Sequence, residues 1–119
     1  MVIGKVISVL FLSREVSHRE HLKSTSYAQH MALGSFYEDV IDLADSLAET
    51  YQGMGSLIDD IPYLSHDGDG NIATILKKHL TLIQRYREKC STDSKALEAV
   101  FDDIEGLYLS TLYKLKFLK

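Results

Sequence analysis

Histidines and carboxylates lie close together in one stretch of this sequence. Three of its five histidines fall close together, at His18, His21 and His30. A run of carboxylates follows, formed by Glu38, Asp39, Asp42, Asp45 and Glu49. Imidazole and carboxylate groups are suitable ligands for iron, manganese or zinc. The pattern therefore predicts a metal site, with a solvated outer helix face as the alternative interpretation.

Spacing indicates which of these groups could act together. Asp45 and Glu49 are four residues apart, so in a helix their carboxylates share one face, about one turn from each other. His30 precedes Asp45 by fifteen residues, which is close to four turns, and it projects to a neighbouring side of the same helix. These groups lie beside the apolar positions of that helix rather than among them.

Four helical segments are predicted to position these residues. Glycine and proline are concentrated between residues 53 and 70, and shorter breaks fall at residues 24–26 and 91–93. The second segment begins near Ser26, which forms a potential capping box with Gln29, and it ends at Gly53. The predicted helices are Val2–Lys23, Ser26–Gly53, Asn71 or Ile72 to Lys89, and Asp93 or Ser94 to Leu118.

Apolar spacing indicates that these helices pack together. In the second segment the apolar positions step by three and four residues, at Leu33, Phe36, Val40, Leu43 and Leu47. The last segment repeats this pattern at Leu97, Phe101, Ile104, Leu107 or Tyr108, Thr111 or Leu112, and Leu115. No segment alternates with a period of two, so we expect an all-α fold with one four-helix domain over residues 1–119. The long link between the second and third helices favours an up-down-down-up order; an ordinary up-down bundle with a flexible loop is the alternative.

Composition restricts the cellular compartment and the classes of partner that we expect. The net charge of −4 argues against a basic surface for nucleic acid. The longest apolar run, Val6–Leu12, is far shorter than the ~20 residues needed to span a bilayer. Cys90 is the single cysteine and fits a reducing compartment. The chain is therefore expected to be cytoplasmic, with neither a membrane nor nucleic acid as its partner.

The register of the histidines and carboxylates resembles that of the Dps-type mini-ferritins. His30 follows His18 by twelve residues, Asp45 follows after fifteen more, and Glu49 four residues later. The likeness covers most of the chain and is strongest over residues 18–55. It implies a ferritin-like four-helix bundle with a long crossover between helices 2 and 3. It also implies that iron, or another divalent transition metal, is bound at a homodimer interface by His18 and His30 of one subunit and Asp45 and Glu49 of its neighbour.

Several positions depart from the pattern of that family. Gly34 stands where the family has an acidic ligand, four residues after the second histidine. Arg19 and Thr50 replace an aromatic and a basic residue, and no lysine-rich segment precedes the first predicted helix. Two functions therefore stay open. One is a Dps-like, iron-sequestering homo-oligomer with at most weak ferroxidase activity; the other is a ferritin-fold binding or regulatory module without metal chemistry. No separate catalytic residue is predicted.

Overall fold

Four helices make up most of the structure, a computed structural model that describes residues 2–66, 70–90 and 93–119. They are α1 (Val2–Lys23), α2 (Tyr27–Gly53), α3 (Ile72–Lys89) and α4 (Lys95–Phe117). No strand occurs in these three ranges. The prediction of an all-α chain is confirmed, and each helix begins and ends within two residues of its expected position. Residues 91 and 92 of the predicted third break lie outside the described residues.

Short polar side chains cap the starts of three helices. The Ser26 Oγ atom accepts a hydrogen bond of 3.2 Å from the backbone N–H of Gln29, and Asn71 and Ser94 cap α3 and α4 in the same way. These bonds satisfy donors that the first turn of a helix leaves without partners. The Ser26 N–H donates to Ser24 Oγ, so the predicted capping box is completed by Ser24 rather than by the Gln29 side chain.

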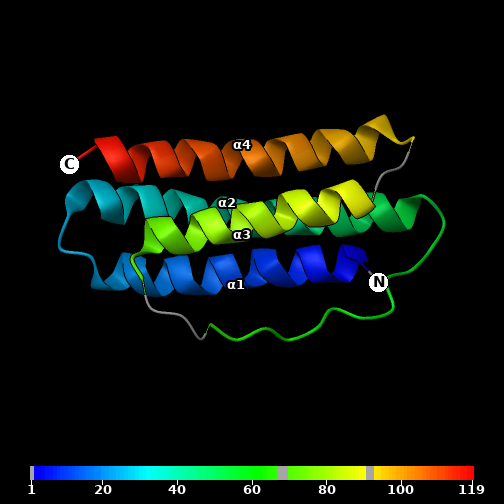
Figure 1. The fold of residues 1–119 in the computed structure, drawn as a ribbon, viewed down its shortest axis with the longest axis horizontal. Coiled ribbons are helices and arrows are strands. Elements are labelled where there is room, and N and C mark those ends of the chain that lie inside the picture. Colours follow the sequence, from blue (N-terminus) through cyan, green and yellow to red (C-terminus); the bar gives the residue numbers. More distant parts are fainter. Residues whose placement is uncertain (1, 67–69, 91–92) are drawn as a thin grey trace.

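Neighbouring helices run antiparallel around the bundle (Figure 1). Helix α1 contacts α2 and α3, and α4 contacts the same two helices. The crossover after α2, described for residues 54–66, passes beside α1 toward the end of the bundle where α2 began, and α2 and α3 run in the same direction. The expected up-down-down-up order is therefore present, and opposite ends of the helix dipoles lie side by side in every contacting pair.

The core lies between the apolar faces of the four helices. On α2, four of the five predicted positions are completely buried: Leu33, Phe36, Val40 and Leu47. On α4, Tyr108 and Thr111 are buried, whereas Leu107 and Leu112 lie at the edge of the core. The Phe36 and Tyr108 rings meet edge to face, with their centroids 5.0 Å apart. The two choices that apolar spacing left open on α4 are thus decided by the packing.

The crossover between α2 and α3 lies directly against α1. A Cβ atom at Gly4 would come within 1.9 Å of the Asp60 carbonyl oxygen, so only glycine permits this approach of the two backbones. One turn later, Ser8 Oγ donates a hydrogen bond of 2.5 Å to the Pro62 carbonyl oxygen. These two contacts hold the crossover along the first half of α1.

Arg87 connects α3 to α4. Its guanidinium lies 2.7 Å from a carboxylate oxygen of Glu98 and 2.7 Å from one of Asp102, and it also pairs with Glu105. The guanidinium carbon lies 5.3 Å from the centroid of the Phe101 ring. Burial alone would lower the pKa of Arg87, but the hydrogen bonds with the three carboxylates outweigh it and raise the pKa.

Cys90 is partly buried where α3 ends, and burial raises the pKa of its thiol. Among the described residues, no helix combines the length and the apolar character needed to cross a membrane.

Candidate functional site

Three histidines and a tyrosine come together where α1 and α2 meet. Because α1 ends at Lys23 and α2 begins at Tyr27, the last turns of α1 lie against the first turns of α2. The His18 ring stacks on Tyr37 with a centroid distance of 4.1 Å and an angle of 6° between the planes. The His21 and His30 rings stack at 3.8 Å. We call this group, formed by His18, His21, His30 and Tyr37, the turn cluster.

Two reciprocal hydrogen bonds orient the rings of His21 and His30. The Nδ1 atom of His21 lies 2.6 Å from the carbonyl oxygen of His30, and Nδ1 of His30 lies 2.9 Å from the carbonyl oxygen of His21. A carbonyl oxygen only accepts, so both Nδ1 atoms donate. In a neutral ring, Nε2 then carries the lone pair that can bind a metal ion. The pair ties α1 to α2 and sets one tautomer for each ring.

Gly34 makes room for His21. A Cβ atom at position 34 would lie 3.0 Å from Cε1 and 3.2 Å from Nδ1 of His21. The imidazole therefore occupies the space into which a side chain at position 34 would extend. Position 34 is where the Dps-type pattern has an acidic ligand. In this chain the His21 ring occupies the space that the side chain of such a ligand would need.

Asp45 and Glu49 lie on α2 away from the turn cluster. At 1.5 Å per residue, they are about 22 Å and 28 Å along the helix from His30. Both side chains are exposed, and within the described part of the chain neither forms an ion pair. The fold thus brings His18 and His30 into one cluster but leaves the two carboxylates outside it.

The described part of a single chain does not contain a complete metal site. Over residues 2–66, 70–90 and 93–119, no group of three or more His, Cys, Asp or Glu side chains could hold a metal ion. The buried polar side chains in these ranges belong to serine, threonine and histidine, so the core there holds no carboxylate. A site shared by His18 and His30 of one copy and Asp45 and Glu49 of another stays a prediction.

A second polar cluster lies inside the bundle, where sequence reasoning did not place one. The Tyr108 hydroxyl donates a hydrogen bond of 2.5 Å to Ser13 Oγ, which lies 2.7 Å from Nδ1 of His79. Since Ser13 accepts from Tyr108, its own hydrogen can be donated to His79. We call these three residues the interior triad. The available signal was a histidine and serines at otherwise apolar helix positions.

Burial controls the protonation of the interior triad. His79 is 7% exposed, and burial, with a smaller contribution from its electrostatic interaction with His66, lowers its pKa to about 4. Burial also raises the pKa of Tyr108, although the hydrogen bond with Ser13 acts in the opposite direction. At neutral pH the triad is therefore an uncharged network that joins α1, α3 and α4.

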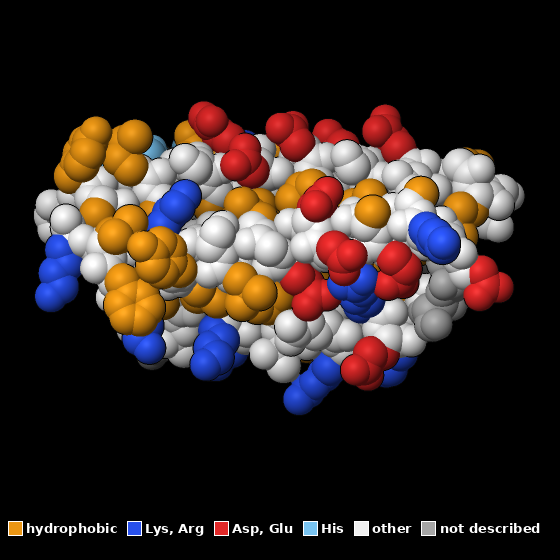
Figure 2. Space-filling view, turned by 90° about the horizontal axis from the view of Figure 1, so that it is seen from above, with side chains coloured by type: hydrophobic (Ala, Val, Ile, Leu, Met, Phe, Trp, Pro, Cys, Tyr) orange, Lys and Arg blue, Asp and Glu red, His pale blue; other side chains and the backbone are white. Residues whose placement is uncertain are grey.

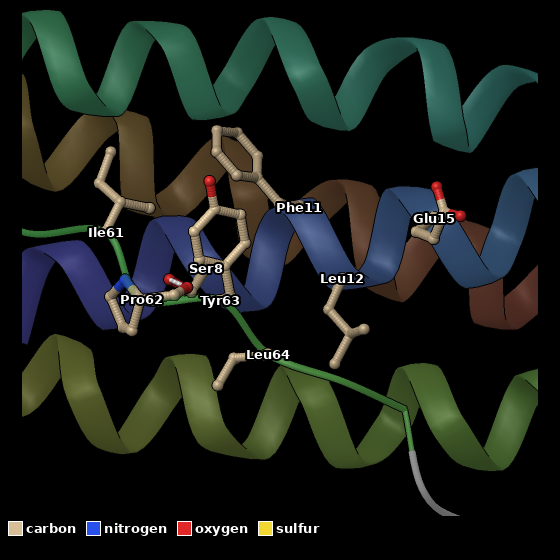
Figure 3. A pocket seen from close by; sticks show the side chains of 8 residues that line it. All are labelled: Ser8, Phe11, Leu12, Glu15, Ile61, Pro62, Tyr63 and Leu64. Carbon is tan, nitrogen blue, oxygen red and sulfur yellow. Dashed lines mark hydrogen bonds between the residues drawn. The ribbon is translucent and has the colours of Figure 1, made fainter.

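A pocket of about 320 Å³ lies between α1 and the crossover (Figure 3). Phe11 and Tyr63 extend toward α2, whereas Leu12 and Leu64 extend toward α3. Glu15 is at one end of the pocket, where a hydrogen bond of 2.8 Å with Arg19 lowers the pKa of its carboxyl group. The lining contains no histidine or cysteine. The pocket could accept an apolar group, but it holds no recognisable catalytic arrangement.

The model of a family of unknown function (DUF5856) matches residues 21–115, which is most of the chain. The match includes His21, His30, Asp45 and Glu49 and begins after His18. No curated protein matches the chain, and no solved structure does. No known activity is attached to the turn cluster by these matches.

Proposed function

The chain belongs to the DUF5856 family of unknown function, and we propose that it is a ferritin-like, Dps-type metal-binding protein with a site shared between two copies. His18 and His30 of one copy and Asp45 and Glu49 of a second copy would hold the ion. The up-down-down-up bundle with its long crossover supports the ferritin-like part of the proposal. The ion would be iron or another divalent transition metal, carried as cargo.

The orientation of His30 carries the proposal. Its Nδ1 donates to the His21 carbonyl oxygen, and this type of bond commonly fixes a metal-binding histidine with Nε2 free for the ion. The ring is only partly buried, so a ligand from outside the chain can reach it. His30 and His21 supply no negative charge, and a divalent ion needs carboxylates to balance its own charge.

Asp45 and Glu49 are suited to provide that charge from a second copy. Both are exposed and form no ion pair with described residues, so their oxygens remain available. Their distance from His30 along α2 prevents them from reaching the histidines of their own chain. Because the His21 ring lies beside Gly34, an acidic side chain at position 34 would have to displace that ring. We therefore expect weaker binding than in a site with the full ligand set, and at most weak ferroxidase activity.

The experiment is calorimetric titration of Zn²⁺, and of Fe²⁺ without oxygen, into metal-free protein. Glu49→Gln keeps the shape of the side chain but removes its charge, and Glu38→Gln is the matched control on the same helix. We expect wild type and Glu38→Gln to bind alike, and Glu49→Gln to bind at least about tenfold more weakly. Equal binding by all three proteins, or no binding by any of them, would show that the metal proposal is wrong.

A second candidate is a ferritin-fold binding or regulatory module without metal chemistry. The observation in its favour is that the turn cluster is already satisfied by its own contacts: His21 and His30 bond to each other's backbone, and His18 stacks on Tyr37. Such contacts stabilise a helix pair without any ion. Metal-free protein that binds neither Zn²⁺ nor Fe²⁺, yet is folded, would support this candidate.

A further inference from the structure

The outward face of α2 and α4 is divided into two halves of different character (Figure 2). At one end, exposed apolar side chains surround the start of α2 and the end of α4; they are Tyr27, Met31, Tyr113, Phe117 and Leu118. These side chains are 46% to 78% exposed. Residues 21–37 and 106–119 contain no Asp or Glu, and their basic residues are Lys23, Lys114, Lys116 and Lys119. This end is the apolar-lysine half.

The other half of the same face is acidic. Residues 38–60 contain no Lys or Arg, and the carboxylates on this part of α2 are Glu38, Asp39, Asp42, Asp45 and Glu49. On α4, Asp103 is exposed, Asp102 pairs with Arg87, and Lys95 is an exposed lysine in this half. Figure 2 shows that the acidic side chains are separated from the apolar end. The face is therefore complementary to itself: when a second copy is turned end for end, its lysines lie opposite the carboxylates of the first.

We propose that this face binds a second copy of the chain around a two-fold axis near the middle of α2. Such an axis, close to residue 40, reverses α2 so that its Tyr27 end lies over the Glu49 end of the other copy. A two-fold contact uses the same surface twice, so each apolar-lysine half then meets an acidic half. The aromatic side chains supply buried area, and the lysine–carboxylate pairs supply orientation.

The dimensions of the molecule allow such a contact. The bundle is 45 Å long. Two adjacent helices are about 20 Å wide, so the face offers roughly the 800 Å² that each partner contributes to a stable interface. Reversal of α2 about residue 40 also places residue 30 of one copy near residue 50 of the other. The contact therefore deepens the proposed function by naming the face that would form the shared site, but its apolar and charged contacts do not require a metal ion.

The test reverses the charge of each half separately and measures mass by sedimentation velocity in EDTA. Lys114→Glu/Lys119→Glu changes the apolar-lysine half, and Asp39→Lys/Asp42→Lys changes the acidic half. Each double variant places like charges against each other in its own dimer, so we expect the dimer Kd to rise at least about tenfold. Mixing the two variants should restore dimers, because opposite charges then meet at both contacts. Lys77→Glu/Lys78→Glu on exposed positions of α3 is the control and should dimerise like wild type.

Each alternative result has a definite meaning. Wild-type protein that sediments at 13.4 kDa, with a dimer Kd above about 100 μM, overturns the proposal. So does a dimer that neither double variant weakens, because another face would then form it. A monomer that binds phosphatidylserine vesicles instead identifies a lipid surface as the occupant. Dimers in EDTA without metal binding would leave this proposal standing while the metal site fails; dimers that require metal would do the reverse.

Discussion

The turn cluster and the interior triad place the same residue type in opposite surroundings. His79 is buried among apolar residues and bonds to the Ser13 side chain, which in turn bonds to Tyr108. His21 and His30 lie at the partly exposed edge between α1 and α2, and each bonds to a backbone carbonyl of the other helix. Solvent access, rather than residue type, therefore separates a histidine that fills the core from histidines that could receive a ligand.

Solvent access also determines how much stability the fold loses when a residue of either cluster is mutated. The interior triad exchanges bonds only among side chains in the core, so a missing partner leaves a buried polar group unsatisfied. The turn cluster is open to water, which can replace a lost partner. We therefore expect mutations in the interior triad to affect stability more than mutations in the turn cluster.

The largest expected effect is a pH dependence that comes from His79. Its pKa is lowered to about 4 in the folded chain by burial, whereas an unfolded histidine titrates near pH 6.5. As the pH falls from about 6.5 to 4, the unfolded chain gains a proton that the folded chain does not, so the free energy of unfolding decreases by about 3 kcal/mol. Urea unfolding followed by circular dichroism at pH 7 and pH 4 measures the loss.

His79→Gln provides the control for that measurement. Glutamine is polar but does not titrate, so the pH-dependent loss in this variant should be smaller than in wild type by about 3 kcal/mol. Carboxylates titrate in both proteins and cancel in the comparison. The same pH dependence in both would contradict a neutral, buried His79.

A smaller effect is expected when one bond of the interior triad is removed. Tyr108→Phe deletes the hydroxyl that donates to Ser13 inside the core, which should lower the free energy of unfolding by about 1–2 kcal/mol. Tyr113→Phe is the matched control, because Tyr113 is on the same helix and 54% exposed, and its effect should stay within about 0.5 kcal/mol. Chemical denaturation of the two variants measures the difference; equal losses would mean that the buried bond contributes nothing.

The smallest effect compares two glycines in helices. Nothing lies within 4 Å of a Cβ atom built at Gly106, so Gly106→Ala should stabilise the chain by about 0.5–1 kcal/mol. At Gly34 the same methyl group would meet the His21 ring at 3.0 Å. Displacing that ring weakens its bond to the His30 carbonyl, so we expect Gly34→Ala to be less stable than Gly106→Ala by about 1 kcal/mol. Thermal unfolding of both variants measures this difference in stability. Equal stabilisation would show that the His21 ring moves aside without a loss of stability.

Most of the fold was predictable from local signals. The glycine and proline residues between 53 and 70, the serines before α2 and α4, and the apolar steps of three and four residues locate all four helices. The length of the second link also favoured the crossover that the structure contains. Caps and apolar periodicity act over a few residues, so they can be read along the chain without knowing its partners.

The candidate site was predictable only in part. The resemblance to the Dps-type mini-ferritins singled out His18, His30, Asp45 and Glu49, and the fold brings the two histidines into one cluster. Spacing did not reveal that His21 would lie over Gly34, because that contact joins two helices across a turn. It also did not reveal the role of His79, because its partner Ser13 is 66 residues away in the sequence and connects it to Tyr108 of a third helix.

Local patterns in the sequence establish the four helices and their apolar faces, because both depend on residue type and on intervals within one helix. Which polar groups are shielded from water depends on how the helices pack. Ser13 and His79 became core residues because α1 packs against α3 and the Tyr108 hydroxyl of α4 reaches Ser13, and Gly4 became irreplaceable because the crossover backbone touches it. Burial and close approach arise between segments that are distant in the chain, so they follow from packing and not from spacing.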